Sequence, residues 1–352
     1  MIKIKINNRT FEVEPGRTIL SIAEDGGIKI PTLCHYPGIE EDASCLICSV
    51  RNKRDGTFTP ACATIAEDGM EIDTKSKEVI EYRKRIIRLI LMEHRAECEA
   101  PCRVSCPFGY DIPLLNRYLS EGKIKEALSL LVSETGDKPL HCQECEAFCE
   151  TNCRRGSIDS PISIRNIRMF LSSRLEETSI KPDDQSRPDN EYKKLFSSKI
   201  TALTAAELSE WLKECEDTTE RYREIGDYLT AGYEAKNCMH CDCRAANDCG
   251  LREIAAQLGV TDPPEKFDSL PIEKKINRNA NLVFERAKCI KCGLCVRACN
   301  DLDGRVALTY LNRGLDLIVS EPIGVDFRYI HSEKAEEIYS NICPTGALRK
   351  IK

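Results

Sequence analysis

The sequence is poor in aromatic residues and has no long apolar run. It contains only 1 Trp and 9 Phe among 352 residues. The most apolar segment, IIRLILM, includes Arg88, so no stretch approaches the ~18 uncharged apolar residues of a membrane-spanning helix. The first residues, MIKIKINNRT, alternate between polar and apolar and lack the apolar centre of a secretory signal. We therefore expect a cytoplasmic protein without a membrane span.

Basic patches and nucleotide-binding motifs are missing as well. The net charge is −6 with no long basic stretch, which makes nucleic acid an unexpected partner. No G-x-G-x-x-G motif occurs, so the sequence predicts no dinucleotide-binding turn. Cysteine, by contrast, is abundant, with 21 residues in tight groups. Spacings of two or three residues between cysteines are typical of metal ligands rather than of disulfides.

The first cysteine group has the spacing C-x10-C-x2-C-x13-C. Four thiolates on the loops of a small sheet suit a [2Fe–2S] cluster, whose two irons each take two sulfurs. The alternative is a zinc ribbon, which usually has two close cysteine pairs, whereas this group has one. The predicted ligands are Cys34, Cys45, Cys48 and Cys62.

The surroundings of this group resemble a known family. PTLCHY, SCLICSV and TPACATIAEDGMEIDT are similar to the N-terminal β-grasp ferredoxin domain of the large iron–sulfur subunit of respiratory complex I. The same domain opens the iron–sulfur subunits of NAD-linked hydrogenases and many [FeFe]-hydrogenases. In that family, a helix like RIIRLILMEH leads into an H-x3-C-x2-C-x5-C motif for a [4Fe–4S] cluster. Here His94 and Cys98 keep only the first spacing.

A different resemblance begins at about residue 95 and continues to about 175. Cys106-Pro107 followed by Asp111-Ile-Pro, and then C-x3-C-x3-C ending at Cys153, resemble the helical two-cluster domain of the glutamate synthase small subunit and dihydropyrimidine dehydrogenase. This resemblance implies two [4Fe–4S] clusters. The first would use Cys98, Cys102 and Cys153, with His94 as fourth ligand unless that residue is a helix-end histidine without metal.

The second cluster of this domain would use Cys106, Cys145 and Cys149. The family takes its fourth ligand, a Gln or Glu, from the following helix. Arg168 stands at that position here, and a permanent cation cannot bind iron. Cys142 is the expected substitute.

The complex I resemblance resumes at CDCRAANDCGLREIAAQLG, which contains a C-x5-C followed by a Leu-rich helix. Four cysteines suffice for a further [4Fe–4S] cluster, with His240 left out; a zinc site is the alternative. The predicted ligands are Cys238, Cys241, Cys243 and Cys249.

The last group, CIKCGLCVRACN, supplies Cys289, Cys292 and Cys295 for the fourth [4Fe–4S] cluster. In two-cluster ferredoxins, the fourth ligand comes from a distant Cys-Pro. Cys343, in YSNICPTGAL, is therefore the predicted partner, and Cys299 is left over. The alternative is that Cys299 binds the local cluster and Cys343 does not. Cys215 is expected to be a buried structural thiol.

These groups divide an α+β chain into five regions. We expect a β-grasp [2Fe–2S] domain, a helical glutamate-synthase-type domain with two [4Fe–4S] clusters, linker and packing helices, a complex I-type [4Fe–4S] segment, and a ferredoxin-like domain with one [4Fe–4S] cluster. Their bounds are 1–76, 77–175, 176–235, 236–262 and 263–352.

The predicted function is a non-catalytic electron relay with one [2Fe–2S] and four [4Fe–4S] clusters. The resemblances imply a flavin- and NADH-binding subunit, a thioredoxin-fold [2Fe–2S] subunit and a separate catalytic module as partners. That module is expected to be a hydrogenase in a bifurcating complex that also uses ferredoxin, with formate dehydrogenase second. The chain ends nine residues after Cys343, where [FeFe]-hydrogenases continue into a catalytic domain. Two alternatives are an NAD(P)H-linked formate dehydrogenase or transhydrogenase subunit that docks a glutamate-synthase-type flavoprotein, and a zinc-scaffolded interaction protein.

Overall fold

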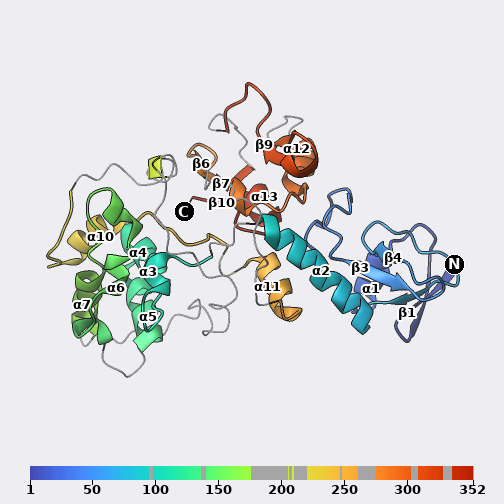
Figure 1. Ribbon diagram of the computed structural model, residues 1–352, viewed down its shortest axis with the longest axis horizontal. Helices are drawn as coiled ribbons and strands as arrows, with labels where there is room; N and C mark the ends of the chain where they lie inside the picture. Colours follow the sequence, from blue (N-terminus) through green and yellow to red (C-terminus); the bar gives the residue numbers. More distant parts are fainter. Residues whose placement is uncertain are drawn as a thin grey trace. The chain divides into compact units, whose positions relative to one another are not determined.

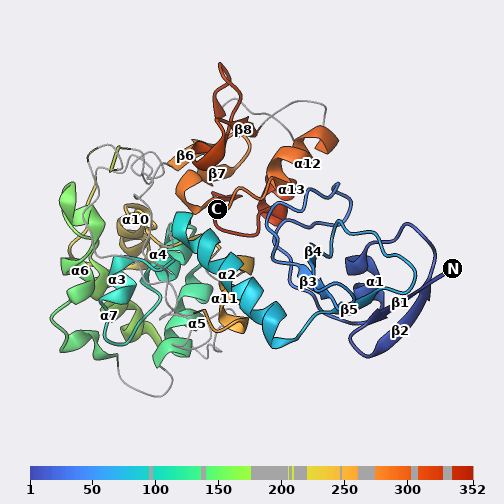
Figure 2. The same cartoon turned by 45° about the vertical axis from the view of Figure 1, so that its right-hand side comes forward.

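The chain forms two compact units, one of residues 1–95 with 248–352 and the other of residues 96–247. The structure is a computed structural model (Figures 1 and 2). It describes residues 1–94, 98–135, 140–175, 205, 208–209, 220–245, 248–260, 274–302, 308–327 and 335–351. Cys215 and most of the region expected to be linker and packing helices lie outside these residues.

A five-stranded mixed sheet opens the first unit, in the order β2-β1-β5-β3-β4. Only the β1–β5 pair is parallel among these strands. Ile4 and Ile6 of β1 are fully buried while the lysines between them face outward, the period-two pattern that the sequence predicts. The strands are β1 (Ile2–Ile6), β2 (Arg9–Val13), β3 (Ser49–Asn52), β4 (Phe58–Pro60) and β5 (Glu71–Asp73).

Two helices accompany this sheet (Figure 2). Helix α1 (Ile19–Asp25) begins at Thr18, whose hydroxyl accepts the Ser21 N–H, and ends at Gly26, the glycine stop that the sequence predicts. Helix α2 (Lys77–Glu93) begins at the Ser76 N-cap and buries one residue in four along a single face. Its buried residues are Val79, Arg83, Ile87 and Leu91.

The C-terminal part of the first unit contains a three-stranded antiparallel sheet in the order β10-β7-β6 and a hairpin of β8 and β9. These strands are β6 (Lys274–Asn277), β7 (Leu282–Glu285), β8 (Thr309–Leu311), β9 (Ile318–Ser320) and β10 (Leu348–Lys350). The helices are α11 (Gly250–Gln257), η3 (Arg286–Lys288), α12 (Leu294–Leu302), η4 (Gly314–Asp316) and α13 (Ala335–Ile342).

The second unit is helical in its described residues (Figure 1). Leucine, isoleucine and alanine form its core, and several cysteines pack against that core from its edge. The elements are α3 (Pro101–Val104), α4 (Ile112–Ser120), α5 (Ile124–Thr135), η1 (His141–Gln143), α6 (Phe148–Thr151), η2 (Arg154–Ser157), α7 (Ile164–Leu175) and α10 (Tyr228–Lys236).

Candidate iron–sulfur sites

The four cysteines of the N-terminal group lie together beside the five-stranded sheet. The Sγ atoms of Cys48 and Cys62 are 3.5 Å apart. The Cys45 and Cys62 thiols hydrogen-bond to the Cys34 thiolate and hold its pKa well below the usual range. The hydrogen bond between Cys48 and Cys62 likewise lowers the pKa of Cys48, to about 7, while hydrogen bonds in the same network raise the pKa values of Cys45 and Cys62. The four thiols are thus close enough to share hydrogen bonds, as the ligands of one [2Fe–2S] cluster would be.

The C-terminal cysteine group also comes together. The pKa values of both Cys289 and Cys292 are raised, first by burial and also by the negative charge of nearby Cys343. Cys295 lies in the same packed cluster of side chains. The turn after Cys343 is fixed by the buried Thr345, whose hydroxyl donates to the Lys288 carbonyl at 3.0 Å. The structure thus brings Cys343 to the C-x2-C-x2-C loop; the side chain of Cys299 lies outside the described part of the chain.

The N-terminal and C-terminal cysteine loops are in direct contact within the first unit. The Ser44 hydroxyl donates to the Cys292 carbonyl at 2.8 Å. Nη2 of Arg297 donates to the Cys34 carbonyl at 2.8 Å and to the Cys292 carbonyl at 3.5 Å. Motif spacing does not reveal this link. The only signals in the sequence are a serine before Cys45 and an arginine after Cys295, and neither is specific.

In the second unit, the electrostatic partners of Cys142 and Cys149 identify a set of four. The pKa of Cys149 is raised to about 12, first by burial and then by neighbours that include Cys106 and Cys142. Cys142 is in turn affected by Cys106 and Cys145. The structure therefore brings together the four cysteines expected for the second cluster of this region, Cys106, Cys142, Cys145 and Cys149.

Arg168, which stands where the related domains have a Gln or Glu ligand, is 1% exposed beside this set. Its Nη2 donates to Glu134 at 2.9 Å, and its guanidinium lies 3.9 Å from the centre of the Tyr110 ring. Burial raises the pKa of Cys142, and Arg168 opposes that shift through its charge and a hydrogen bond. Arg168 thus favours the thiolate form of Cys142, the residue expected to substitute for the family's Gln or Glu ligand.

The remaining cysteines group differently from the expectation. Cys238 and Cys241 line a cavity with Cys102 and Cys153, rather than standing only with Cys243. The Cys243 N–H donates to the Cys98 carbonyl at 3.0 Å, so these two are neighbours. His94 is the buried C-cap residue of α2, and Cys249 is the N-cap residue of α11.

Strained backbone residues mark the cysteine loops. Eight described residues other than glycine have a positive φ, and three of them are asparagines, which tolerate this conformation. The other five all lie within two residues of a predicted ligand. Each such residue costs roughly 1–2 kcal/mol, so the loops hold a geometry that needs a compensating interaction, as a bound cluster would supply. They are Ala43, Leu46, Ala147, His240 and Lys291.

Lys291 is one of these five residues, and its backbone N–H donates a hydrogen bond to Cys289 Sγ at 3.3 Å. Such amide-to-sulfur hydrogen bonds are one means by which proteins tune clusters. Within the described residues, no three His, Cys, Asp or Glu side chains stand close enough to hold a single metal ion. The ligands of a [4Fe–4S] cluster each bind a different iron, so they need not converge on one point.

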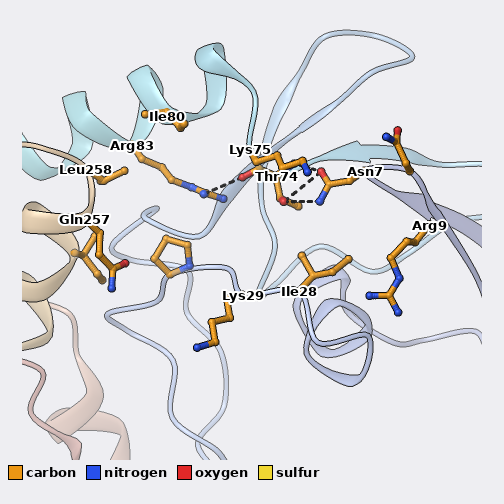
Figure 3. Close-up of a pocket in the computed structure, with 13 residues that line it drawn as sticks. Asn7, Arg9, Ile28, Lys29, Thr74, Lys75, Ile80, Arg83, Gln257 and Leu258 are labelled. Carbon is orange, nitrogen blue, oxygen red and sulfur yellow. Dashed lines mark hydrogen bonds between the residues drawn. The ribbon is translucent and has the colours of Figure 1, made fainter.

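The first unit also contains a cavity lined by several basic side chains (Figure 3). Arg9, Lys29 and Lys75 surround it, and Arg83 and Thr74 are joined by a hydrogen bond at its wall. None of its 13 lining residues is a cysteine.

None of the described helices combines the length and apolarity needed to cross a bilayer.

Two family models match the chain, and both describe iron–sulfur domains. Residues 1–77 match the 2Fe-2S iron-sulfur cluster binding domain. Residues 88–180 match the dihydropyrimidine dehydrogenase domain II, 4Fe-4S cluster. The chain therefore has a mixed α/β structure with an N-terminal [2Fe–2S] domain followed by a [4Fe–4S] domain.

Three of its relatives are components of NAD- or NADP-linked oxidoreductases. One component of the NADH-quinone oxidoreductase of Rhizobium meliloti is 30% identical over 164 residues, which cover 43% of this chain and 19% of that protein. The gamma component of the NAD-reducing hydrogenase HoxS of Cupriavidus necator is 26% identical over 155 residues, 42% of this chain and 65% of that protein. The HndD component of the NADP-reducing hydrogenase of Solidesulfovibrio fructosivorans is 30% identical over 170 residues, 43% of this chain and 28% of that protein. The similarity thus spans only part of each relative.

Proposed function

We propose that this chain is a non-catalytic electron-relay subunit of a cytoplasmic NAD(H)-linked oxidoreductase complex, with one [2Fe–2S] and four [4Fe–4S] clusters. Clusters of these types pass single electrons at potentials set by nearby charge and hydrogen bonds. The chain's own residues would hold the clusters, exclude water from them and fix their spacing. The experiments below also distinguish this proposal from its two alternatives, a complex with a formate dehydrogenase or a glutamate-synthase-type flavoprotein and a zinc-scaffolded interaction protein.

The observation that carries this proposal is the contact between the two cysteine loops of the first unit. Ser44 and Arg297 tie the carbonyl of Cys34 to that of Cys292 through short hydrogen bonds. A storage or purely structural site has no need of a second site against it. A relay does, because electron transfer between cofactors requires them to be close. The buried guanidinium atoms Nε and Nη1 of Arg297 add positive charge between the loops, which offsets the charge of the thiolates.

The partners follow from the relatives. A flavin- and NADH-binding subunit and a thioredoxin-fold [2Fe–2S] subunit would supply or accept electrons at one side, and a hydrogenase would complete the complex. Two relatives are named as components of NAD- and NADP-reducing hydrogenases, which favours a hydrogenase over a formate dehydrogenase. Electron bifurcation with ferredoxin is the form of this function that we favour, because the clusters outnumber those needed for a single path.

The relay is tested first on the isolated chain by EPR. Because the two loops touch, the reduced N-terminal [2Fe–2S] and C-terminal [4Fe–4S] centres should broaden each other's signals. Cys343→Ala should remove the broadening while leaving the [2Fe–2S] signal. Signals without mutual broadening in the wild type, from a protein that holds both centres, would contradict the relay.

Anaerobic purification of the native complex tests the partners. We expect the chain to copurify with a flavoprotein and hydrogenase subunits. A formate dehydrogenase or a glutamate-synthase-type flavoprotein in their place would decide for the alternative complex. A colourless protein that contains zinc would decide for the scaffold.

A further inference from the structure

A cavity in the second unit gathers four cysteines from three separate parts of the chain. Cys102 is in α3, Cys153 is the N-cap residue of η2, and Cys238 and Cys241 follow the end of α10. About eighty residues separate Cys153 from Cys238 in the sequence. Neighbouring ligands could not be recognised across such a gap from spacing alone.

The electrostatics of Cys102 confirm that these thiols are close. Its pKa is raised well above the usual value, first by burial and then by the negative charges of Cys153, Cys238, Cys241 and, most weakly, Cys149. Cys98, which the spacing places in the same set as Cys102, does not line this cavity.

The wall of the cavity is built for a buried anionic group. Asn116 is 1% exposed and lines the cavity, where its side-chain amide hydrogen-bonds to Cys238 and lowers the pKa of that thiol against the effect of burial. Amide-to-sulfur hydrogen bonds are one means by which proteins tune clusters.

Two buried arginines supply the charge that such a group needs. Arg154 and Arg155 both line the cavity. Arg155 donates to Asp159 through Nε and to the Asn237 carbonyl at 3.3 Å, so its position is fixed next to Cys238. Four thiolates with a [4Fe–4S] core carry net negative charge, and burying that charge requires nearby cations.

We propose that Cys102, Cys153, Cys238 and Cys241 together hold one [4Fe–4S] cluster. This inference rests on the proposed function and changes the ligand sets that the spacing predicts. The C-x2-C pair of Cys238 and Cys241 replaces His94 and Cys98 as the completing ligands of the helical domain's first cluster. The cluster then joins segments on both sides of the region between 175 and 220, and metal binding contributes to the folding of the second unit.

Iron analysis of single and double variants distinguishes the two ligand sets. Wild-type chain, purified without oxygen, should contain about 18 iron. Cys102→Ala and Cys238→Ala should each leave about 14. If both residues hold the same cluster, the double variant should also leave about 14, because the same four irons cannot be lost twice. If they hold different clusters, it should leave about 10.

The matched control pairs Cys102→Ala with Cys106→Ala, two residues of different sets, and should leave about 10 iron. The [2Fe–2S] EPR signal of the first unit serves as an internal standard for folded protein in every sample, and iron is expressed per [2Fe–2S] spin. Where a variant keeps a three-iron centre instead, its EPR signal should appear once in the Cys102 and Cys238 double variant and twice in the control.

A double variant near 10 iron, equal to the control, would overturn the grouping and leave the relay proposal intact. Full iron in Cys238→Ala would also overturn the grouping. Wild-type chain without iron–sulfur spectra would instead overturn the proposed function itself.

Discussion

At the scale of single residues, Arg168 stands at the position where the sequence resemblance predicts a Gln or Glu ligand. This buried cation pairs with Glu134 and favours the Cys142 thiolate. A cation near a cluster stabilises its reduced, more negative state. Arg168→Gln should therefore retain iron and lower the midpoint potential of one cluster by tens of millivolts, where about 60 mV corresponds to ~1.4 kcal/mol for one electron.

The measurement is a potentiometric EPR titration of the wild type and the variant. Arg168→Lys, which keeps the charge, is the matched control and should leave the potential near that of the wild type. Cys142→Ala should instead lose iron. An unchanged potential in Arg168→Gln, or full iron with unchanged EPR spectra in Cys142→Ala, would contradict this account.

The two ferredoxin-type cysteines Cys343 and Cys299 should behave oppositely. Cys343→Ala removes a ligand that the structure brings beside Cys289 and Cys292. The protein should lose about four iron or form a three-iron centre. Cys299→Ala should keep all iron, because the cluster that would need it has no other ligands. Iron loss in the Cys299 variant alone, measured by the same analysis, would decide for the alternative assignment.

His94 stays a prediction at this scale. The spacing from Cys98 suggests a ligand, and the structure shows a buried residue at the end of α2. His94→Ala should disturb one [4Fe–4S] cluster in its EPR spectrum. An unchanged spectrum with full iron would identify His94 as a helix-end residue without metal.

At the scale of elements, helix α2 is held to the N-terminal sheet by a buried cation. Arg83 is 5% exposed and donates to the Ser49 carbonyl through Nε and Nη2 and to the Thr74 carbonyl through Nη1, at 3.0–3.1 Å. Burial lowers its pKa to about 10, so it stays charged at neutral pH. Arg83→Met should reduce the free energy of unfolding by about 3 kcal/mol, because it leaves two buried carbonyls without donors.

Chemical denaturation of the holoprotein, followed by the visible absorption of the [2Fe–2S] centre, measures this loss. Arg85→Met on the exposed face of α2 is the control and should change the stability by no more than ~0.5 kcal/mol. Equal losses in the two variants would contradict a specific role for Arg83.

The element scale also shows what the sequence could predict. Alternation in MIKIKINNRT predicts β1, because this signal is local. The cysteine groups that share one loop, such as Cys289 and Cys292, are predicted for the same reason. The pairing of Cys102 with Cys238 is not, because it depends on how α3, η2 and α10 pack. Positive φ at Leu46 and Ala147 is equally invisible in the sequence.

At the scale of the whole molecule, cysteines border apolar cores that contain few aromatic residues. The chain has 21 cysteines and only 1 Trp, and cysteine side chains pack against the cores of both units. Cluster ligation then supplies stability that aromatic burial supplies elsewhere. Removal of the iron should therefore unfold a large part of this chain.

The total iron content tests this description of the whole chain. One [2Fe–2S] and four [4Fe–4S] clusters give about 18 iron per chain, measured after anaerobic purification. A value near 10 would mean that the helical domain carries no clusters, because its two sites account for about eight. That outcome would leave the contact between the Cys34 and Cys292 loops as the core of a shorter relay.

The isolated chain, free of flavin, should not reduce an artificial dye with NADH, and turnover in that assay would contradict a relay without its own catalytic site.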